Sequence, residues 1–483
     1  MQKKIISRLL CSVVISTLAI ANADASVVLL AKGELDGSRA DLSTKTAGLL
    51  ENGLAGNLLG GVGSGFAWAG GNTFLATPDR GPNASAYNPL VDDTTSYISR
   101  FQSITMGLSK NAIGSALPYS LTPTLSATTL LSSQSVLNYG SGALGTGIVN
   151  GQSFHLGSGV PTLNQLDHTN YFTGRSDNFD ASKNSINPNN ARLDPEAIRV
   201  SNDGRSVFIS DEYGPYVYQF DRMTGARIKS FALPGNLAIS NLSSQSAVEI
   251  ATNKTGRVTN KGMEGLSITP DGKTLVGIMQ AALGQDKKGS LRIVTIDIAT
   301  GATHEYAYKL TTGSGVSEIV ALNDHQFLVD ERDGSGLGDG TNAVIKQIYL
   351  IDLNGAQDVT AMSGDLSSKA VSKTLFVDLV QILKTNGVSA NNIPAKIEGI
   401  AFGEDIIVDG VINHTLYVTN DNDFVAGVAG NNQFFVFGFT DTDLAAIGAS
   451  YKAQEIVNLP EPTTYLMMFG GLGLIALRRR QDK

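Results

Sequence analysis

Acidic side chains lie at both ends of several short apolar segments, where they could bind a divalent cation. The segment RLDPEAIRVSNDGRSVFISDEYG, which begins at Arg192, shows the arrangement once. Ile, Val and Phe fill both halves and Asn202-Asp203-Gly204 lies between them, so the pattern predicts a β-hairpin with a tight turn. In an antiparallel hairpin the start of the first strand lies beside the end of the second, which places Glu196 near Asp211 and Glu212. Three carboxylates at such range repel one another unless water or a cation neutralises them, and calcium is the natural hard cation.

The same arrangement recurs along the chain, in repeats that start near residues 64, 196, 264, 318 and 398. In each repeat, one residue at the start of the first strand is paired with polar or charged residues at the end of the second strand. Besides the hairpin above, these pairs are Gly65 with Asp79 and Arg80, Glu264 with Gln280, Glu318 with Asp330, Glu331 and Arg332, and Glu398 with Asp421 and Asp423. When such units surround an axis, equivalent positions converge on a central channel, so the glutamates would become neighbours. Acids at strand ends also solubilise sheet edges and cap turns, and that interpretation stays open for each acid taken singly.

These repeats predict an all-β fold, a β-propeller with six blades favoured over seven, with loop insertions and one or two short helices. We expect the propeller over residues 26–440, with insertions at about 102–163 and 361–395. The second insertion holds the best helix candidate, around Lys373 to Lys384. The strand-like segment SVVLLAKGELDGS is expected to close the ring against the last blade.

The N-terminal segment predicts export. MQKKIISRLLCSVVISTLAIANADAS has a basic start, an apolar run from Leu9 to Ile20, and the small residues Ala23 and Ala25 around a cleavage site. This pattern is typical of a signal peptide over residues 1–25 and of the Sec pathway. Cleavage there removes Cys11, the one cysteine of the sequence, so the mature protein would form no disulfide and use no thiol chemistry.

The C-terminal segment LPEPTTYLMMFGGLGLIALRRRQDK places Pro-Glu-Pro before an apolar run from Tyr465 to Leu477 and an arginine cluster. The run is short for a membrane span, which takes roughly 20 apolar residues. This tail, residues 460–483, resembles the PEP-CTERM sorting signal of Gram-negative bacteria, with residues 441–459 as a spacer. The resemblance implies recognition by an exosortase, a transient inner-membrane anchor, and release or attachment at the cell surface. A plain C-terminal membrane anchor is the alternative.

Composition and motif content exclude several classes of function. The formal net charge is −8, and both end segments carry more basic than acidic residues, so the body between them is a poor binder of nucleic acid. The five histidines are scattered and no H-E-x-x-H motif occurs, so zinc hydrolysis is not expected. The sequence also lacks a G-x-S-x-G elbow and a P-loop.

Basic residues accompany the repeated acids. Arg80, Lys261 and Arg332 each lie within three residues of a repeat carboxylate. Such cations often only neutralise their acidic neighbours. The more specific hypothesis is that the site acts on phosphate esters. Calcium held by the acids would bind substrate oxygens and lower the pKa of a bound water, while Arg and Lys hold the phosphate.

Several segments resemble signature segments of the phytase-like family, which is described as having esterase-like activity. They are ATPDRGPN from Ala76, DPEAIRV and SDEYGPYVYQFD from Asp194 onward, and NKGMEGLSITPDGKTL from Asn260. The resemblance spans most of residues 60–440 and implies a β-propeller; related propeller phytases are calcium-dependent phosphomonoesterases that act through an acidic channel mouth. The matching positions are Asp79, Arg80, Glu196, Asp211, Glu212, Glu264 and Glu398. Two positions depart from the pattern: Ala197 replaces the glycine that follows Glu264 and Glu398, and Gln280 stands where other repeats end in an acid.

We therefore expect an exported, calcium-dependent hydrolase of phosphate or other small-molecule esters. The expected metal ligands are Asp79, Glu196, Asp211, Glu264, Glu318, Asp330, Glu331, Glu398 and Asp421. The expected catalytic residues are Arg80, Glu212, Glu264, Lys261 and Arg332. The alternative is a non-enzymatic propeller that binds extracellular polysaccharide or another matrix component, which the sorting tail and the Ser- and Gly-rich stretch at 102–163 suggest.

Overall fold

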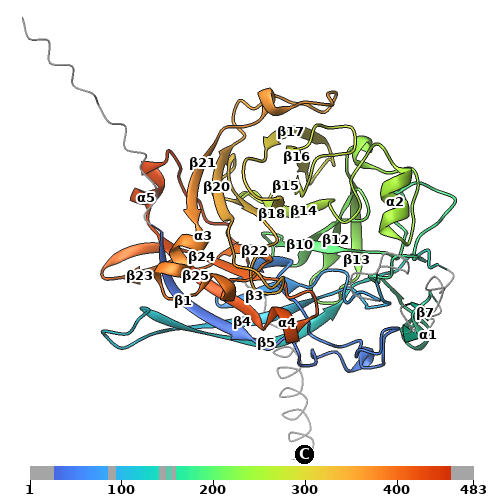
Figure 1. Cartoon of the computed structure of the whole chain (residues 1–483), viewed down its shortest axis with the longest axis horizontal. Coiled ribbons are helices and arrows are strands. Elements are labelled where there is room, and N and C mark those ends of the chain that lie inside the picture. The colour runs from blue at the N-terminus through green and yellow to red at the C-terminus, as the bar shows by residue number, and fades with distance from the viewer. Residues whose placement is uncertain (1–26, 85–93, 141–147, 150–151, 154–158, 458–483) are drawn as a thin grey trace, which may run out of the picture.

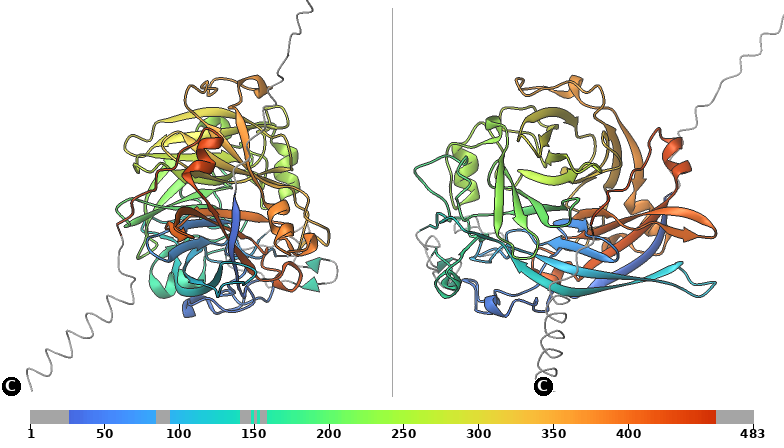
Figure 2. Two further views of the ribbon diagram at one scale, coloured as in Figure 1. Left: turned by 90° about the vertical axis from the view of Figure 1, so that its left-hand side faces the viewer. Right: turned by 180° about the vertical axis from the view of Figure 1, so that it is seen from behind.

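Five antiparallel sheets, here called blades 1 to 5, surround one axis (Figures 1 and 2). The computed structural model describes residues 27–84, 94–140, 148–149, 152–153 and 159–457. From the axis outward, blade 1 consists of β2 (Gly65–Trp68), β3 (Thr73–Thr77), β4 (Arg100–Lys110) and β5 (Tyr119–Leu130), and blade 2 of β10 (Pro195–Val200), β11 (Ser206–Asp211), β12 (Tyr216–Asp221) and β13 (Arg227–Ala232). In the same order, blade 3 consists of β14 (Met263–Ile268), β15 (Thr274–Met279), β16 (Ser290–Asp297) and β17 (Thr303–Lys309), blade 4 of β18 (Gly315–Ala321), β19 (Gln326–Arg332), β20 (Lys346–Asp352) and β21 (Lys373–Asp378), and blade 5 of β22 (Ile397–Phe402), β24 (Val411–Asn420), β25 (Asn432–Phe439) and β1 (Val28–Leu35). The innermost strands β2, β10, β14, β18 and β22 contact one another in a closed ring around a central channel.

The blade number differs from the sequence prediction: the described residues form five blades, so the six favoured from the sequence is wrong. Each repeat supplies the two innermost strands of one blade. The stretches predicted as insertions supply outer strands of these same blades, because β4 and β5 complete blade 1 and β21 completes blade 4. The extra length between repeats therefore extends existing blades and adds none.

The helices are short and more numerous than the one or two expected. The α-helices are α1 (Thr162–Asp167), α2 (Ser246–Thr252), α3 (Leu379–Thr385), α4 (Ala426–Ala429) and α5 (Asp441–Ala446). The helix predicted at residues 373–384 is half wrong, because its first half is the outer strand β21 and α3 begins only at Leu379. Asp378 marks the change, since its side chain accepts a hydrogen bond from Gln381 N at 2.9 Å and so caps the helix.

The ring closes as predicted, through a strand from the beginning of the chain. β1 pairs antiparallel with β25, from Val28 opposite Gly438 to Leu35 opposite Asn432. The short strand β23 (Ile406–Val408) adds to the last blade by pairing with β24. Two separate two-stranded sheets pair β6 (Ser132–Ser133) with β9 (Asn170–Tyr171) and β7 (Ile148–Val149) with β8 (Gln152–Ser153). Because the last blade contains strands from both ends of the chain, the ring cannot open without breaking the β1–β25 ladder.

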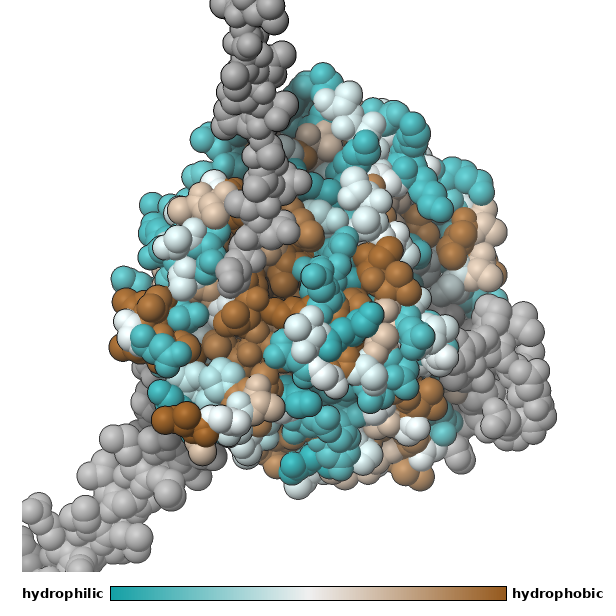
Figure 3. Space-filling view, turned by 60° about the vertical axis from the view of Figure 1, so that its left-hand side comes forward, coloured by the Kyte–Doolittle hydropathy of each residue, from teal (hydrophilic) through white to brown (hydrophobic). Residues whose placement is uncertain are grey.

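Apolar side chains fill the spaces between neighbouring blades. Leu75 and Phe101 of blade 1, for example, belong to one buried cluster with Ile209 and Tyr218 of blade 2. On the outer surface some apolar side chains stay exposed to solvent. The side of the molecule that carries β23 shows apolar residues among polar ones (Figure 3), and the β23–β24 hairpin exposes Ile407, Val411 and Ile412.

The segment after α5 lies across one end of the channel. We call this the lower end, where the innermost strands finish, and the opposite end, where they begin, the upper end. Lys452 N donates to Leu322 O at 2.8 Å in blade 4, and Gln454 Nε2 donates to Val200 O at 2.8 Å in blade 2. The segment predicted as a spacer, 441–459, therefore packs on the propeller at least as far as Val457, whose N–H donates to Asn202 O at 2.9 Å.

No helix within the described ranges is long and apolar enough to cross a membrane. The predicted signal peptide at 1–25 and the sorting tail at 460–483 lie outside those ranges.

A buried ion pair plugs the channel between its two ends. Arg199 of β10 forms an ion pair with Glu318 of β18 at 2.8 Å, and it donates hydrogen bonds to Phe66 O of β2 at 2.7 Å and to Ile319 O at 3.1 Å. Glu318 is fully buried and accepts a hydrogen bond from Leu266 N of β14 at 3.1 Å. Burial raises the pKa of Glu318 to about 7 even though Arg199 lowers it. Four of the five innermost strands thus meet at this pair.

We expect Arg199→Met to lower the free energy of unfolding by about 3–5 kcal/mol, because the Glu318 carboxylate stays buried without its partner. The double variant Arg199→Met/Glu318→Gln should recover part of the loss, since it leaves no buried charge. Urea unfolding at pH 8 measures both. A loss below about 1 kcal/mol in the single variant would show that the pair is not a structural link.

Candidate active site

β-Bulges aim the repeated acids at the upper end of the channel. In blade 2, Pro195 pairs with Asp211 and Ile198 pairs with Ile209, so the first strand has one residue more than its partner in this interval. Glu196 lies in that interval. Blades 3, 4 and 5 have a register shift at the corresponding place. Because a bulge bends its strand and re-aims the side chain, each of these blades can point one residue at the axis.

The strand registers define two rings of equivalent positions. The first ring, in the innermost strands, consists of Ser64, Glu196, Glu264, Ser317 and Glu398. The second ring, where the second strands end, consists of Asp79, Glu212, Gln280, Arg332 and Asp421. The whole second ring and the three glutamates of the first ring line one cavity of about 210 Å³. The predicted convergence of acids from distant repeats is therefore what the structure shows for these residues.

Glu318 does not reach this cavity, contrary to the prediction that it lies on the rim. Val316 pairs with Glu331 and Ile319 with Val329, so Ser317 takes the position of Glu196 and Glu318 takes that of Ala197. A shift of one residue turns a side chain to the other side of a strand. In the fourth repeat the residue that faces the cavity is therefore Ser317, one position before the predicted Glu318, and Glu318 belongs to the channel plug.

Three other predicted ligands also lie away from the cavity lining. Asp211 and Glu331 point to the other face of their strands, because side chains alternate along a strand and Glu212 and Arg332 line the cavity. Asp211 accepts hydrogen bonds from the backbone N–H groups of Asp194 at 3.1 Å and Tyr213 at 3.0 Å, which fixes the end of β11. Glu331 accepts from Tyr308 Oη at 2.6 Å and pairs with Lys373, which joins blade 4 to blade 3. Asp330 is fully buried and neither of its carboxylate oxygens has a hydrogen-bond partner within the described structure.

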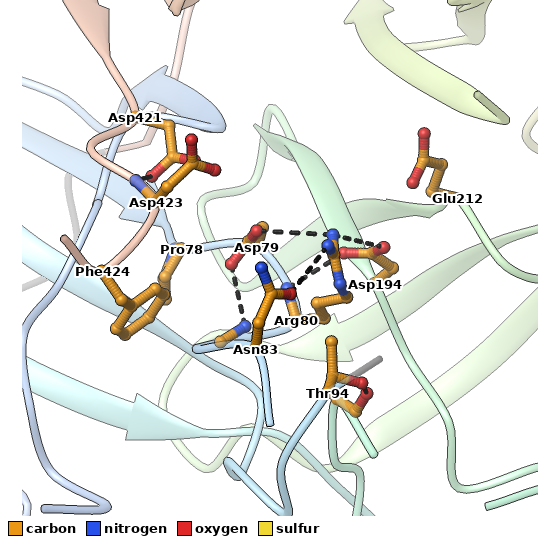
Figure 4. Close-up of polar contacts among 12 residues, drawn as sticks. Pro78, Asp79, Arg80, Asn83, Thr94, Asp194, Glu212, Asp421, Asp423 and Phe424 are labelled. Atoms are coloured by element: carbon orange, nitrogen blue, oxygen red, sulfur yellow. Dashed lines mark hydrogen bonds and ion pairs between the residues drawn. The ribbon is translucent and has the colours of Figure 1, made fainter. Parts of the chain in front are cut away.

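The carboxylates at the upper end form two groups, each with one oxygen per residue within 4.8 Å of the others. The first, here called group A, consists of Asp79, Asp421 and Asp423; the second, group B, consists of Asp194, Glu196 and Glu212. Figure 4 shows Asp421 and Asp423 on one side, Glu212 on the other, and Asp79 with Arg80 and Asp194 between them. All six residues are buried except Asp423, which is partly exposed.

Four cationic side chains face these acids. Arg80 lies between the groups, with its Nη1 3.6 Å from Asp79 Oδ2 and 3.5 Å from Asp194 Oδ2. Arg332 pairs with Glu398, and its Nη2 lies 3.6 Å from Glu264 Oε1. Lys396 pairs with Asp423, and Lys261 lines the cavity as an exposed residue. The predicted catalytic residues Arg80, Glu212, Glu264, Lys261 and Arg332 are therefore all brought together in one cavity.

Two glycines allow this close packing. A Cβ on Gly61 would lie 1.6 Å from Asp421 Oδ1, and a Cβ on Gly174 would lie 1.6 Å from Arg80 O. No other residue leaves room for the acid and the arginine at these points.

Mutual repulsion and burial perturb the acids strongly. Burial raises the pKa of Asp79 to about 7 and that of Glu264 to about 8, and the Glu398 carboxylate adds to the rise at Glu264. Burial, reinforced by neighbouring carboxylates, also raises the pKa values of Glu196, Glu212 and Asp421 well above their ordinary range. The charged forms of these acids therefore need a cation in addition to the Arg and Lys side chains present.

Unpartnered oxygens point to the same need. Glu212 Oε2, Glu264 Oε2 and Asp421 Oδ2 are buried without a hydrogen-bond partner in the described structure. Their second oxygens are held in place, because Gly262 N donates to Glu212 Oε1 at 3.2 Å and Gln280 Nε2 donates to Glu264 Oε1 at 2.6 Å. Buried carboxylate oxygens of this kind fit a hard divalent cation, which prefers oxygen ligands.

Sequence reasoning missed three residues of the site, Asp194, Lys396 and Asp423. Asp423 was recognised at the end of the last repeat and was not included among the ligands. Asp194 and Lys396 immediately precede the innermost strands, and both stand two residues before a first-ring glutamate. Extending each repeat by two residues toward the N-terminus would have found them.

A known family model matches most of the chain. Residues 57–424 match the family described as "Phytase-like: Esterase-like activity of phytase". The chain belongs to this family. The matched region contains all five innermost strands and every residue of groups A and B, so the family resemblance stated from the sequence is confirmed.

Individual relatives are distant. An "Uncharacterized secreted protein" of Arthroderma benhamiae is 29% identical over 221 residues, which cover 38% of this chain and 43% of that protein. Among solved structures, a putative 6-phosphogluconolactonase from Bacteroides uniformis is 13% identical, covers 76% of this chain and 83% of its own, and has a TM-score of 0.29. Hydrazine synthase of Kuenenia stuttgartiensis is 16% identical, covers 49% of this chain and 67% of its own, and has a TM-score of 0.24.

We expect the protein without divalent cations to lose stability as pH rises, in part through Glu264. The folded-state pKa of Glu264, about 8, exceeds its ordinary value of 4.5, so its contribution is fully present below about pH 4.5 and is lost as pH rises through 8. Glu264→Gln should therefore gain about 2 kcal/mol relative to the unchanged protein between pH 5 and pH 8, since one pKa unit corresponds to about 1.4 kcal/mol and neighbours share the effect. Denaturant unfolding in chelator measures this. An unchanged difference at the two pH values would contradict the pKa assignment.

Proposed function

We propose that the protein is a calcium-dependent hydrolase of phosphate esters. The observation that supports this is one cavity in which two buried carboxylate groups, A and B, lie beside Arg80 and Arg332. The carboxylates would hold cations, and the arginines would bind an anion brought against those cations. Membership of a phytase-like family described by esterase-like activity is consistent with this combination.

Group B is the better cation site of the two. One of its carboxylate oxygens, Glu212 Oε2, has no hydrogen-bond partner in the described structure. Among the described residues, Arg80 is the cation that pairs with group B, and it does so at Asp194. A calcium ion bound there would supply positive charge that attracts phosphate oxygens and favours ionised carboxylates. Its presence would also lower the pKa of Glu212, which burial and the neighbouring Glu264 and Asp194 raise in the structure as described.

Two glutamates are suited to proton transfer. With Oε1 held by Gln280, Glu264 carries a proton near neutral pH and can give it to the leaving ester oxygen. Glu212, once ionised, can accept the proton of the attacking water through the carboxylate oxygen that does not bind the cation. The products are an alcohol and a free phosphate, and each proton given at the leaving group is replaced by one taken from water.

Phosphate suits this cavity better than a large acyl group. The lining is polar and charged, and the volume of about 210 Å³ accommodates a phosphate group with part of its alcohol. Arg332 presents its guanidinium beside Glu264 and Glu398, where it can stabilise negative charge that develops on a transferred phosphoryl group. An alkyl ester would find little apolar surface here.

Export is a second part of the proposal. The signal-peptide pattern at residues 1–25 and the name of the secreted relative support it. We propose that an exosortase recognises the 460–483 tail in a Gram-negative host, so that the protein acts at the cell surface or outside the cell. Binding to extracellular polysaccharide remains the alternative role.

Purified protein should hydrolyse p-nitrophenyl phosphate with calcium and lose the activity in chelator. Glu212→Gln should reduce kcat at least about 100-fold, because a positioned proton acceptor contributes roughly 10²–10⁴-fold. Glu404→Gln is the matched control: it removes one exposed acid at the lower end of the channel and should leave kcat unchanged. Turnover of p-nitrophenyl acetate measured in parallel distinguishes phosphate esters from carboxylic esters. Equal activity with calcium and with chelator would refute the cation requirement.

A further inference from the structure

Groups A and B occupy related positions in the fold but differ in charge at one place. Asp194 precedes β10 and Lys396 precedes β22, and they are equivalent because Glu212 N donates to Asp194 O at 3.0 Å and Asp421 N donates to Lys396 O at 3.1 Å. Blade 2 thus places a carboxylate where blade 5 places an ammonium group. The difference adds an acid to group B and a cation to group A.

The Lys396 ammonium group already occupies group A. Its Nζ pairs with Asp423 Oδ1 and lies 3.6 Å from Asp421 Oδ2, and both carboxylates belong to the three whose oxygens converge within 4.8 Å. The ammonium group therefore lies against two of the three carboxylates that a bound metal ion would use. Asp421 Oδ2 has no hydrogen bond in the described structure, so its contact with Lys396 is an ion pair at longer range.

The lysine has room to leave. Its side chain is 33% exposed, whereas the side chain of Asp421 is 1% exposed, so the cation can move while the acid is fixed. Lys396 also lines the cavity that holds Arg332 and Lys261. A lysine that leaves group A therefore remains beside the position at which an anion would bind.

We infer that Lys396 is an internal counter-ion of group A, so that a divalent cation enters this group only by displacing the lysine into the cavity. The inference rests on the proposed function, since it concerns the cations proposed there. Calcium then fills group B first and group A second. The displaced ammonium group adds a positive charge to the anion site, which couples the second cation to substrate binding. Lys396 thus acts through its own charge, which moves from group A to the anion site, and takes no part in the reaction itself.

Calcium titration calorimetry of the purified protein tests the order of binding. In Lys396→Met the weaker calcium site should bind at least about ten-fold tighter, because the competing charge is gone and every 1.4 kcal/mol changes an affinity ten-fold. Lys396→Arg keeps a cation and should retain the original affinity. Lys110→Met is the control, because Lys110 is an exposed lysine at the end of β4 that does not line the cavity, and its calcium affinities should not change.

Thermal unfolding in chelator shows whether each variant is folded, and Lys396→Gln is a second neutral variant if the methionine variant is not. Unchanged or weaker binding in a folded neutral variant overturns the inference and leaves the proposed function standing. Absence of calcium binding in both the unchanged protein and the neutral variant overturns the inference together with the cation requirement. If calcium binds at the second site, group A, in the neutral variant but not in the unchanged protein, the inference is supported.

Discussion

Repulsion among buried carboxylates at the upper end of the channel is the constraint on which the rest of the site depends. Six acids form two groups there, and five of them, all except Asp423, are buried where water does not screen them. Arg80 between the groups, with Arg332 and Lys396 beside them, offsets part of the negative charge. The negative charge that these cations do not offset, together with burial, raises the pKa values of Asp79, Glu196, Glu212, Glu264 and Asp421. Acids with raised pKa values are suited to bind cations and to transfer protons.

The acids are held in place by buried contacts that join the blades below them. Arg199 and Glu318 form a plug that joins strands from four blades, and the segment around Gln454 lies across the lower end. The β1–β25 ladder prevents the ring from opening. A rigid ring of this kind holds the acids at distances that they would not keep if each blade were free to move.

The blades repeat in structure but not in chemistry. The second ring holds Asp79, Glu212, Gln280, Arg332 and Asp421 at equivalent positions. Three acids, one amide and one guanidinium therefore stand around one axis, and each meets a different neighbour. Gln280 orients Glu264 while Arg332 bridges toward Glu398, so the departure from the repeat pattern at Gln280 has a structural role. An arrangement of this kind can bind a cation and an anion side by side.

Hairpin patterning and turn residues are local signals, so they are enough to predict the repeat unit, the closing strand and the residues Arg80, Glu212, Glu264, Lys261 and Arg332 that share the cavity. The family follows from a different signal, the resemblance of segments such as ATPDRGPN and NKGMEGLSITPDGKTL to those of the phytase-like family. The number of blades is not a local property and needs the folded structure, since outer strands such as β21 have no signature that assigns them to a blade. It also decided which acids face the channel. A bulge or a one-residue change of phase turns a side chain to the other face of a strand, which separates Glu318, Asp211 and Glu331 from acids that look the same in the sequence.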